Sequence, residues 1–213
     1  MIRIMKYWMY LSTAFFLLNC ILDNKQKKDA LPVLGEKEII DGQEVFHTVG
    51  DFSFVNQDSA EVTNATFAEQ VYVSDFFFTS CPTICPKMTQ QMKRLHDAFA
   101  DNSAVGLISH TIDTKRDSVE RLKQYAENIG IRSAEKWHFV TGEKEAIYDI
   151  ADDYFSIALE NEDAPEGFDH SGRLILVDKE RRIRSFADGT NPAEVDRLML
   201  DIEKLLKEYE EAL

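Results

Sequence analysis

The sequence feature that most constrains the fold is a β-rich run at residues 71–78, which ends in three successive phenylalanines, Phe76, Phe77 and Phe78. Continuous apolar character of this kind predicts a strand that is buried on both faces. Residues 87–100 follow with apolar side chains at the three- and four-residue spacing of an amphipathic helix. A buried strand that leads into a helix is typical of a sheet with helices on both sides.

The rest of the chain continues this alternation. We expect strands at residues 105–112, 137–140 and 155–159, and helices at residues 117–130 and 143–154. A hairpin of residues 174–177 and 183–186, a last helix from residue 192 almost to Leu213 and an N-terminal β-hairpin of residues 52–55 and 61–63 complete the pattern. Asp117, with Glu120 three residues later, is the expected N-cap of its helix. The predicted fold class is α/β, with βαβ crossovers and a central sheet flanked by helices.

Composition and charge exclude several classes of protein. Hydrophobic residues make up 44% of the 213 residues, which is enough for a sizeable core and argues against a disordered chain. Acidic residues outnumber basic ones by 38 to 24, so the formal charge is −14. A nucleic-acid binder needs clustered cations to meet phosphates, so we expect no nucleic-acid partner.

The first nineteen residues differ from the rest of the chain. Arg3 and Lys6 are their only charges, and an apolar run follows at residues 7–18. A basic start and a short apolar stretch are typical of an export signal, because a membrane span needs about 20 residues. The alternative is an uncleaved anchor helix at about residues 2–22. Either way, the remainder lies outside the cytoplasm.

Cys20 favours a lipid anchor over an anchor helix. The residues before it, Leu17-Leu18-Asn19, resemble the cleavage box of a bacterial lipoprotein, although Asn19 replaces the usual small residue. We therefore predict a signal peptide at 1–19 that ends at a lipidated Cys20, a polar tether at 20–46 and a folded domain at 47–213. The expected location is the bacterial cell envelope, anchored to the membrane with the domain on the periplasmic side.

Cys81 and Cys85 lie directly after the phenylalanine-rich strand, at the start of the next helix. Open α/β sheets bind ligands at this carboxyl edge of their strands. A thiol at a helix start has a lowered pKa, and the thiolate is both the nucleophile and the metal ligand. Since residues four apart share a face of a helical turn, both sulfurs can converge on one point. They can clamp one ion or form a disulfide.

Histidines are the candidates to complete a metal site, because two sulfurs rarely do so alone. His170 stands out among five, since it follows a polar loop at residues 160–168 and precedes a strand. Two thiolates and one imidazole suit copper best, and zinc is the competing ion. A plain disulfide between Cys81 and Cys85 stays open as an alternative, because an exported protein meets oxidising conditions.

Several motifs in the same order resemble the Sco/SenC family, copper-delivery proteins that help assemble cytochrome c oxidase. They lie within residues 48–208. The most specific is the string Phe76-Phe77-Phe78-Thr79-Ser80-Cys81-Pro82-Thr83-Ile84-Cys85-Pro86; the others are Ile112-Asp113 with Arg116-Asp117, Trp137 with Thr141-Gly142, Asp169-His170-Ser171, and Leu176-Val177-Asp178 leading to Phe186-Ala187-Asp188-Gly189. The resemblance implies a thioredoxin-like central mixed sheet.

The same resemblance implies that Cys81, Cys85 and His170 bind copper, as Cu(I) or Cu(II). It further implies that the chain is a metallochaperone rather than an enzyme. Its expected partners are subunit II of cytochrome c oxidase, at its dinuclear copper site, and other copper chaperones. We expect the acidic surface to dock on a basic patch of the partner.

A thiol–disulfide oxidoreductase is the alternative function. In that case the oxidase cysteines form a disulfide, Cys81 attacks it, and Cys85 resolves the mixed disulfide. Cys81 and Cys85 are then a redox-active pair. The three-residue spacer between them departs from the two-residue spacer of the usual thioredoxin motif. Asp75 is the remaining puzzle, because an unpaired charge within a buried strand is costly. We expect it to hydrogen-bond the loop or to face solvent at an edge.

Overall fold

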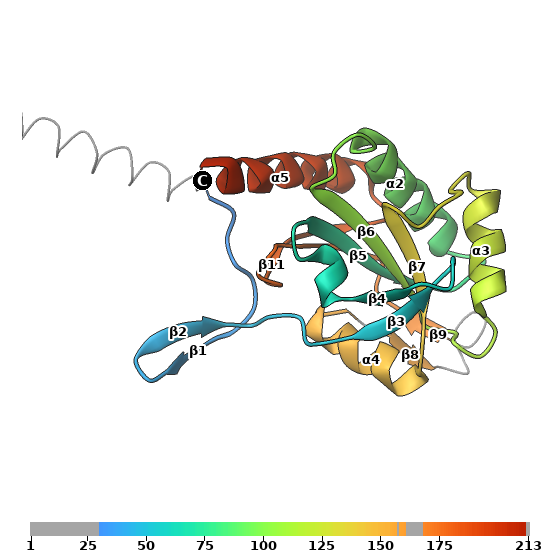
Figure 1. The fold of residues 1–213 in the computed structure, drawn as a ribbon, viewed down its shortest axis with the longest axis horizontal. Coiled ribbons are helices and arrows are strands. Elements are labelled where there is room, and N and C mark those ends of the chain that lie inside the picture. The colour runs from blue at the N-terminus through green and yellow to red at the C-terminus, as the bar shows by residue number, and fades with distance from the viewer. Residues whose placement is uncertain (1–29, 157, 161–167, 212–213) are drawn as a thin grey trace, which may run out of the picture. The chain divides into compact units, whose positions relative to one another are not determined.

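The computed structural model describes residues 30–156, 158–160 and 168–211 (Figure 1). A seven-stranded sheet has the order β11-β10-β5-β6-β7-β3-β4. Its strands are β3 (Ser53–Asn56), β4 (Glu61–Thr63), β5 (Val71–Phe77), β6 (Val105–Thr111), β7 (Trp137–Thr141), β10 (Arg173–Val177) and β11 (Ile183–Asp188). The central pairs β5–β6 and β6–β7 are parallel, and the outer pairs are antiparallel. The predicted thioredoxin-like mixed sheet and its N-terminal hairpin, β3–β4, are confirmed.

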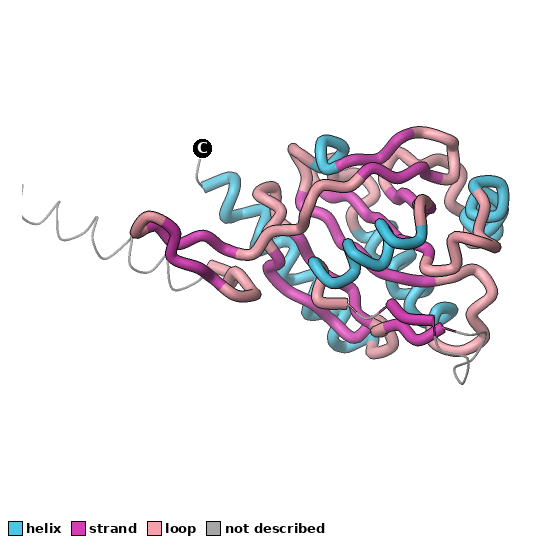
Figure 2. Tube along the Cα trace, turned by 90° about the horizontal axis from the view of Figure 1, so that it is seen from below, coloured by secondary structure: helices cyan, strands magenta, loops and turns pink. Residues whose placement is uncertain are grey.

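Helices cover both faces of the sheet (Figures 1 and 2). They are α2 (Cys85–Ala98), α3 (Val119–Asn128), α4 (Lys144–Asp153) and α5 (Pro192–Glu211), with a short 3-10 helix, η1 (Asn64–Phe67), after β4. Every residue of β5 and β6 is buried, as the continuous apolar run predicts.

The alternation of side chains along β5 separates two aromatic clusters. Phe76 points to the face that α4 covers, where its ring stacks on His110 (4.8 Å between centroids) and meets Tyr154 edge-on. Phe77 points to the opposite face and contacts Tyr125 of α3 at 5.3 Å. Successive residues of a strand face opposite sides, so three consecutive phenylalanines fill both halves of the core and the loop beyond.

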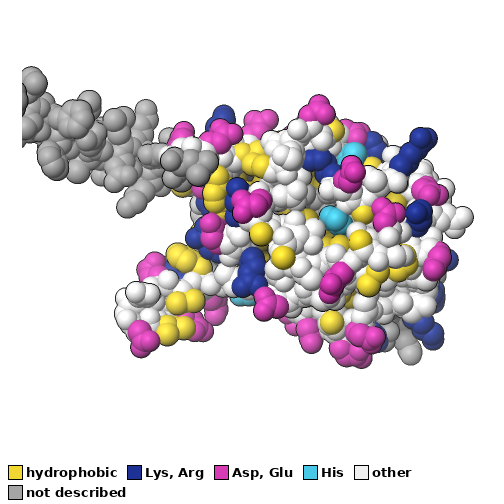
Figure 3. Space-filling model, viewed as in Figure 1, with side chains coloured by type: hydrophobic (Ala, Val, Ile, Leu, Met, Phe, Trp, Pro, Cys, Tyr) yellow, Lys and Arg dark blue, Asp and Glu magenta, His cyan; other side chains and the backbone are white. Residues whose placement is uncertain are grey.

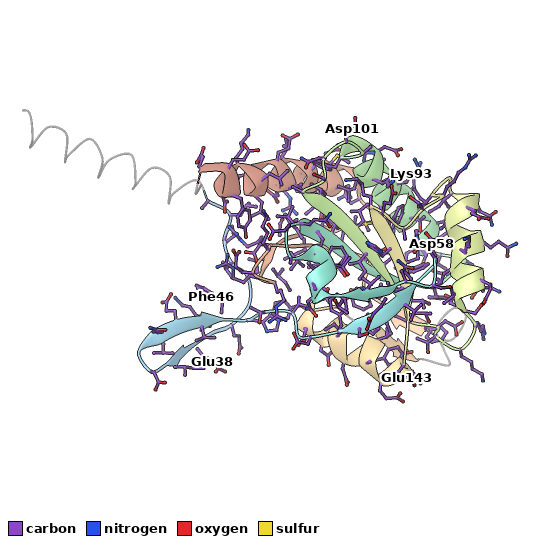
Figure 4. All side chains as sticks on the ribbon, in the orientation of Figure 1. Glu38, Phe46, Asp58, Lys93, Asp101 and Glu143 are labelled. Carbon is purple, nitrogen blue, oxygen red and sulfur yellow. The ribbon has the colours of Figure 1, made fainter. Side chains whose placement is uncertain are left out.

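The segment expected to be a tether contains two strands that were not predicted. Strands β1 (Lys37–Ile40) and β2 (Gln43–Phe46) form an antiparallel hairpin of their own, which carries Glu38 and Phe46 (Figure 4). Just before it, the backbone N–H of Leu34 donates to the carbonyl of Ile183 in β11 (2.8 Å). The predicted signal peptide and Cys20 lie outside the described residues. Within the described ranges, none of the helices has the length and apolar character to cross a bilayer.

Two predicted element starts are wrong in an informative way. Helix α2 begins at Cys85 rather than residue 87, because proline is accepted at the second position of a helix. The N-cap of α3 is Ser118, whose hydroxyl accepts from the backbone N–H of Arg121 (3.4 Å), and not Asp117. Asp117 is fully buried and turned toward the cysteine loop instead. Beyond α4, strand β8 (Ala158–Glu160) pairs with β9 (Phe168–His170), and Phe155 lies in a turn.

Candidate functional site

The cysteine loop connects the end of β5 to the start of α2. The backbone N–H of Cys81 donates to the carbonyl of Phe78 (3.3 Å), which turns the chain back at once. At the other end, the carbonyl of Ile84 accepts from the N–H groups of Lys87 and Met88, both at 3.0 Å. Cys81 therefore lies in the loop and Cys85 in the first turn of the helix, so it is the loop rather than a helical face that brings the sulfurs together.

The two thiols contact each other in a largely buried position. The structure has both cysteines in the thiol form, with Cys81 8% and Cys85 1% exposed. A side-chain hydrogen bond joins the sulfurs of Cys85 and Cys81, and the sulfur of Cys81 also lies 3.5 Å from the hydroxyl of Thr83. The structure thus brings the two sulfurs together, although Cys81 lies outside the helical turn that the sequence argument assumed.

The environment separates the acidities of the two thiols. Burial alone would raise the pKa of Cys81, but hydrogen bonds from the Thr83 hydroxyl, from backbone N–H groups and from the Cys85 thiol stabilise the thiolate and bring its pKa below the ordinary value. Burial raises the pKa of Cys85 well above that value, and the neighbouring Cys81 and Asp75 add to the effect. The expected low pKa therefore belongs to the loop cysteine and not to the one in the helix.

Asp117 fixes the start of the cysteine loop through hydrogen bonds to Thr79, a role that was not predicted from the sequence. Its carboxylate accepts from the backbone N–H of Thr79 (3.0 Å) and from the hydroxyls of Thr79 (2.5 Å) and Thr111 (2.6 Å). Arg121 pairs with the same carboxylate at 3.3 Å and donates to the Thr79 hydroxyl at 2.6 Å. The one available signal was a second helix-capping residue, Ser118, directly after Asp117.

Asp75, in β5, ends a buried series of hydrogen bonds that runs from Trp137 through Ser109. The Trp137 indole N–H donates to the hydroxyl of Ser109 (2.9 Å), which in turn donates to the carboxyl of Asp75. Burial raises the pKa of Asp75 to about 7, although the Ser109 hydrogen bond opposes the shift. The expectation of an exposed edge acid is therefore wrong, since Asp75 is 2% exposed and bonds a neighbouring strand rather than the loop.

The backbone of His170 is described but its side chain is not, so the predicted third ligand has no described contacts. It ends β9, where it pairs with Ala158. The ring of Phe168 in β9 lies 5.1 Å from the ring of Phe78, at the base of the cysteine loop. Immediately after His170, Ser171 and Gly172 share a pocket of about 390 Å³ with Ile84, which lies between the cysteines. The chain around His170 thus runs beside the loop.

The other four histidines have contacts in other parts of the fold. His47 bonds the carbonyl of Asp153 (2.7 Å), His96 pairs with Asp97 (3.0 Å) and His138 bonds the amide of Asn56 (3.1 Å). Burial lowers the pKa of His110 to about 3 and the pKa of His138 to about 4, so both are neutral packing residues. Among the side chains that the structure describes, there is no cluster of three or more His, Cys, Asp or Glu suited to a metal.

Comparison with known proteins agrees with the motifs. The family described as SCO1/SenC matches residues 40–207. A SCO1/SenC family lipoprotein from Bacillus anthracis strain Ames has a TM-score of 0.68 at 25% identity, covering 75% of this chain and 95% of its own.

Two further solved structures are informative. Arabidopsis thaliana ScoI with copper bound has a TM-score of 0.62 at 25% identity, over 75% of this chain and 99% of its own. BsSco, a member of the Sco family of cytochrome c oxidase assembly proteins with a disulfide switch, has a TM-score of 0.63 at 30% identity, over 75% of this chain and 93% of its own.

Proposed function

This chain belongs to the SCO1/SenC family, and we propose that it binds copper and delivers it to cytochrome c oxidase, at the dinuclear copper site of subunit II. The observation that carries the proposal is the contact between the buried thiols of Cys81 and Cys85 at the end of β5. The copper in Arabidopsis ScoI and the oxidase-assembly role of the family of BsSco support it.

The donor set suits copper. Two soft thiolates stabilise Cu(I), and an imidazole nitrogen lets the same site hold Cu(II). We assign the third ligand to His170, because Phe168 and Gly172 on either side of it lie against Phe78 and Ile84 of the cysteine segment. Zinc accepts the same donors, but a structural zinc site has four protein ligands, and this chain has no third cysteine near the pair.

Delivery proceeds by exchange of ligands. Cys81 is the more exposed of the two cysteines and has the lower pKa, so it is the first to meet an incoming thiolate of the client, the oxidase subunit that receives the copper. Cys85 stays buried at the helix start and releases the ion last. Each client thiol gives up a proton on binding copper, and each departing cysteine of this chain takes one up.

The N-terminal residues determine where in the cell the copper-binding domain is located. Lipidation of Cys20 anchors the domain to the membrane of the bacterial envelope, on the periplasmic side. The lipoprotein from Bacillus anthracis supports this mode of attachment. Because the oxidase is itself a membrane protein, the anchor confines the search for the client to the membrane surface.

A copper titration of the full chain under reducing conditions tests the proposal. We expect one copper ion to bind and, as Cu(II), to give a thiolate charge-transfer band that the Cys81→Ser variant lacks. His170→Ala should weaken Cu(II) binding much more than Cu(I) binding, since the soft ion depends on sulfur. His96→Ala, a change on the outer part of α2, is the matched control and should leave both affinities unchanged. Equal losses of Cu(I) and Cu(II) affinity in His170→Ala would contradict the assignment of His170.

A second function, reduction of the client cysteines, is favoured by the asymmetry of the two thiols. The Cys81 thiolate attacks a client disulfide, Cys85 then attacks the Cys81 sulfur, and the client leaves as a dithiol while this chain keeps the disulfide. A thiol reductant of the envelope must restore the pair. Rapid reduction of oxidized subunit II by the metal-free chain, without copper transfer, would make this the main role.

A further inference from the structure

A groove between α2 and α3 opens beside Cys81. Its volume is about 360 Å³. Thr79 and Cys81 lie at the loop end, Pro86 and Lys93 line it from α2, and Tyr125 and Ile129 line it from α3 and the residue after it. The pocket beside Ile84 and Gly172 shares none of its lining residues and does not include Cys81. Of these two pockets, the α2–α3 groove is therefore the one that has Cys81 in its wall.

The groove presents mainly apolar surface around that sulfur. The Tyr125 hydroxyl is already bonded to the hydroxyl of Thr89 (2.7 Å), so Tyr125 offers its ring. Pro86 and Ile129 add aliphatic surface. Pockets that combine apolar walls with a few polar groups hold side chains of a partner in a fixed orientation.

The charges around the groove differ from those of the whole chain. Residues 79–132 contain eight basic and six acidic side chains, whereas the whole chain has 24 and 38. Two of the six acids, Asp113 and Asp117, are buried. Figure 3 shows acidic side chains spread over the face, with basic side chains among them at the edge where α3 lies. This local surface differs from the acidic docking surface expected from the net charge.

One cation, Lys93, lines the groove, and two others, Arg121 and Lys87, adjoin lining residues. Lys93 lines it and pairs with Asp97 (2.5 Å) on the outer side of α2 (Figure 4). Arg121 donates to Thr79, a lining residue, and Lys87 is exposed next to Pro86. None of the lining residues is acidic within the described part of the chain. Cations at the edge of an apolar groove favour a partner with acidic side chains.

We propose that the α2–α3 groove is the docking site for a cysteine-bearing segment of the partner protein in which acidic residues flank the cysteine. The inference rests on the proposed function, since either copper transfer or disulfide reduction brings a client sulfur to Cys81. The groove fixes the side of approach. The partner segment approaches Cys81 from the side of α2 and α3. It does not occupy the β9–β10 side, where His170 lies.

The test uses synthetic peptides with one cysteine activated as a 2-thiopyridyl disulfide, added to the full, reduced, metal-free chain. The Cys81 thiolate attacks the peptide sulfur, a disulfide forms between Cys81 and the peptide, and pyridine-2-thione leaves with the electron pair of the broken bond. Its absorbance gives the rate. At low salt the acidic peptide should react about tenfold faster than a basic peptide of the same length, and the ratio should shrink toward one at high salt.

Charge reversal on the groove gives the decisive comparison. In the double variant Lys87→Glu/Lys93→Glu the acidic peptide should lose its advantage, whereas a neutral peptide should react at its former rate. The matched control is Lys204→Glu/Lys207→Glu on α5, which has the same net charge and should keep the wild-type ratio. In Ile129→Ala, a peptide with leucine beside the cysteine should react more slowly, and one with glycine there should not.

Three outcomes would overturn the docking site: a basic peptide that reacts as fast as the acidic one, an α5 control that behaves like the groove variant, or a larger change of the ratio in Glu194→Lys, which alters the other pocket. Copper titration of the same variants keeps this failure distinct from failure of the proposed function. The groove variant should bind copper with wild-type affinity. Loss of docking preference with intact copper binding would overturn the groove alone.

Discussion

Asp117 and Thr79 are joined by two hydrogen bonds across 38 residues of sequence, from the Thr79 backbone N–H (3.0 Å) and from its hydroxyl (2.5 Å). Thr79 lies two residues before Cys81, so the carboxylate fixes the start of the cysteine loop. Asp117→Asn removes the charge and offers Thr79 and Thr111 one acceptor oxygen where they now use two. We expect the free energy of unfolding, measured in guanidinium, to fall by about 2 kcal/mol.

A positioning role for Asp117 also requires a change in the cysteine itself. In Asp117→Asn the pH profile of iodoacetamide alkylation should shift upward, because the loop no longer holds the N–H groups that stabilise the Cys81 thiolate. Glu120→Gln, on the exposed side of the same helix turn, is the control and should change neither quantity. A less stable variant with an unaltered alkylation profile would show that Asp117 supports the fold only.

Thr83 gives the most direct test of how the Cys81 thiolate is stabilised. Its hydroxyl lies 3.5 Å from the sulfur. Thr83→Val removes the hydrogen bond at constant shape, so the pKa of Cys81 should rise and its alkylation rate at neutral pH should fall by about threefold. Thr83→Ser keeps the hydroxyl and should retain the wild-type rate. Peptide mapping should find Cys81 modified well before Cys85, and preferential modification of Cys85 would contradict the assignment of roles.

The sequence predicts those parts of the fold that rest on periodicity. Continuous burial of residues 71–78 and the helix that follows them need only local patterns of apolar residues, and both were predicted. The hairpin β1–β2 was missed because none of its residues is buried: Phe46 is half-buried and the other seven are exposed, so no buried face marks the strands. The Asp41-Gly42 turn between the strands was the local signal that could have found it. Strand β9 has three residues, which is too short for a periodic signal.

The site was predictable where chemistry is local, and not where it depends on contacts across the fold. Cys81 and Cys85 were identified because thiols after a buried strand are a local pattern. Asp75 is bonded by Ser109 of β6, and Asp117 is bonded by Thr111 of β6 and by Thr79 of the loop, so their burial follows from strand register. Asp117 also satisfied a local rule, that of a helix N-cap, and only the tertiary fold decides between the two uses of its carboxylate.

Asp75 should make stability depend on pH in a defined direction. Burial raises its pKa to about 7, above the 3.8 of an unperturbed aspartate. Between these values the native state keeps a proton that the unfolded chain has lost, so the contribution of Asp75 is full at acid pH and declines by up to about 4 kcal/mol as pH rises through 7. Asp75→Asn lacks this titration. Guanidinium unfolding from pH 5 to pH 8 should show the variant gaining stability relative to wild type.

A surface acid provides the control for the Asp75 experiment. Asp101 is exposed, at the turn after α2, so Asp101→Asn should follow the wild-type pH profile. The amide oxygen that Asp75→Asn introduces can still accept from Ser109, which keeps the substitution from leaving that hydroxyl unpaired. Parallel pH profiles for wild type and Asp75→Asn would mean that the carboxyl titrates alike in both states.

His110 should act in the opposite direction over the same range of pH. Burial lowers its pKa to about 3 from 6.5, so below 6.5 the unfolded chain takes up a proton that the native state refuses, and stability falls by about 2 kcal/mol between pH 6.5 and pH 5. Over the same range the contribution of Asp75 to stability rises by a similar amount as the pH falls. The effects of Asp75 and His110 therefore largely offset each other in wild type. Acidification should therefore destabilise Asp75→Asn steeply and stabilise His110→Phe, with His96→Gln following wild type. Identical slopes in Asp75→Asn and His110→Phe would exclude this compensation.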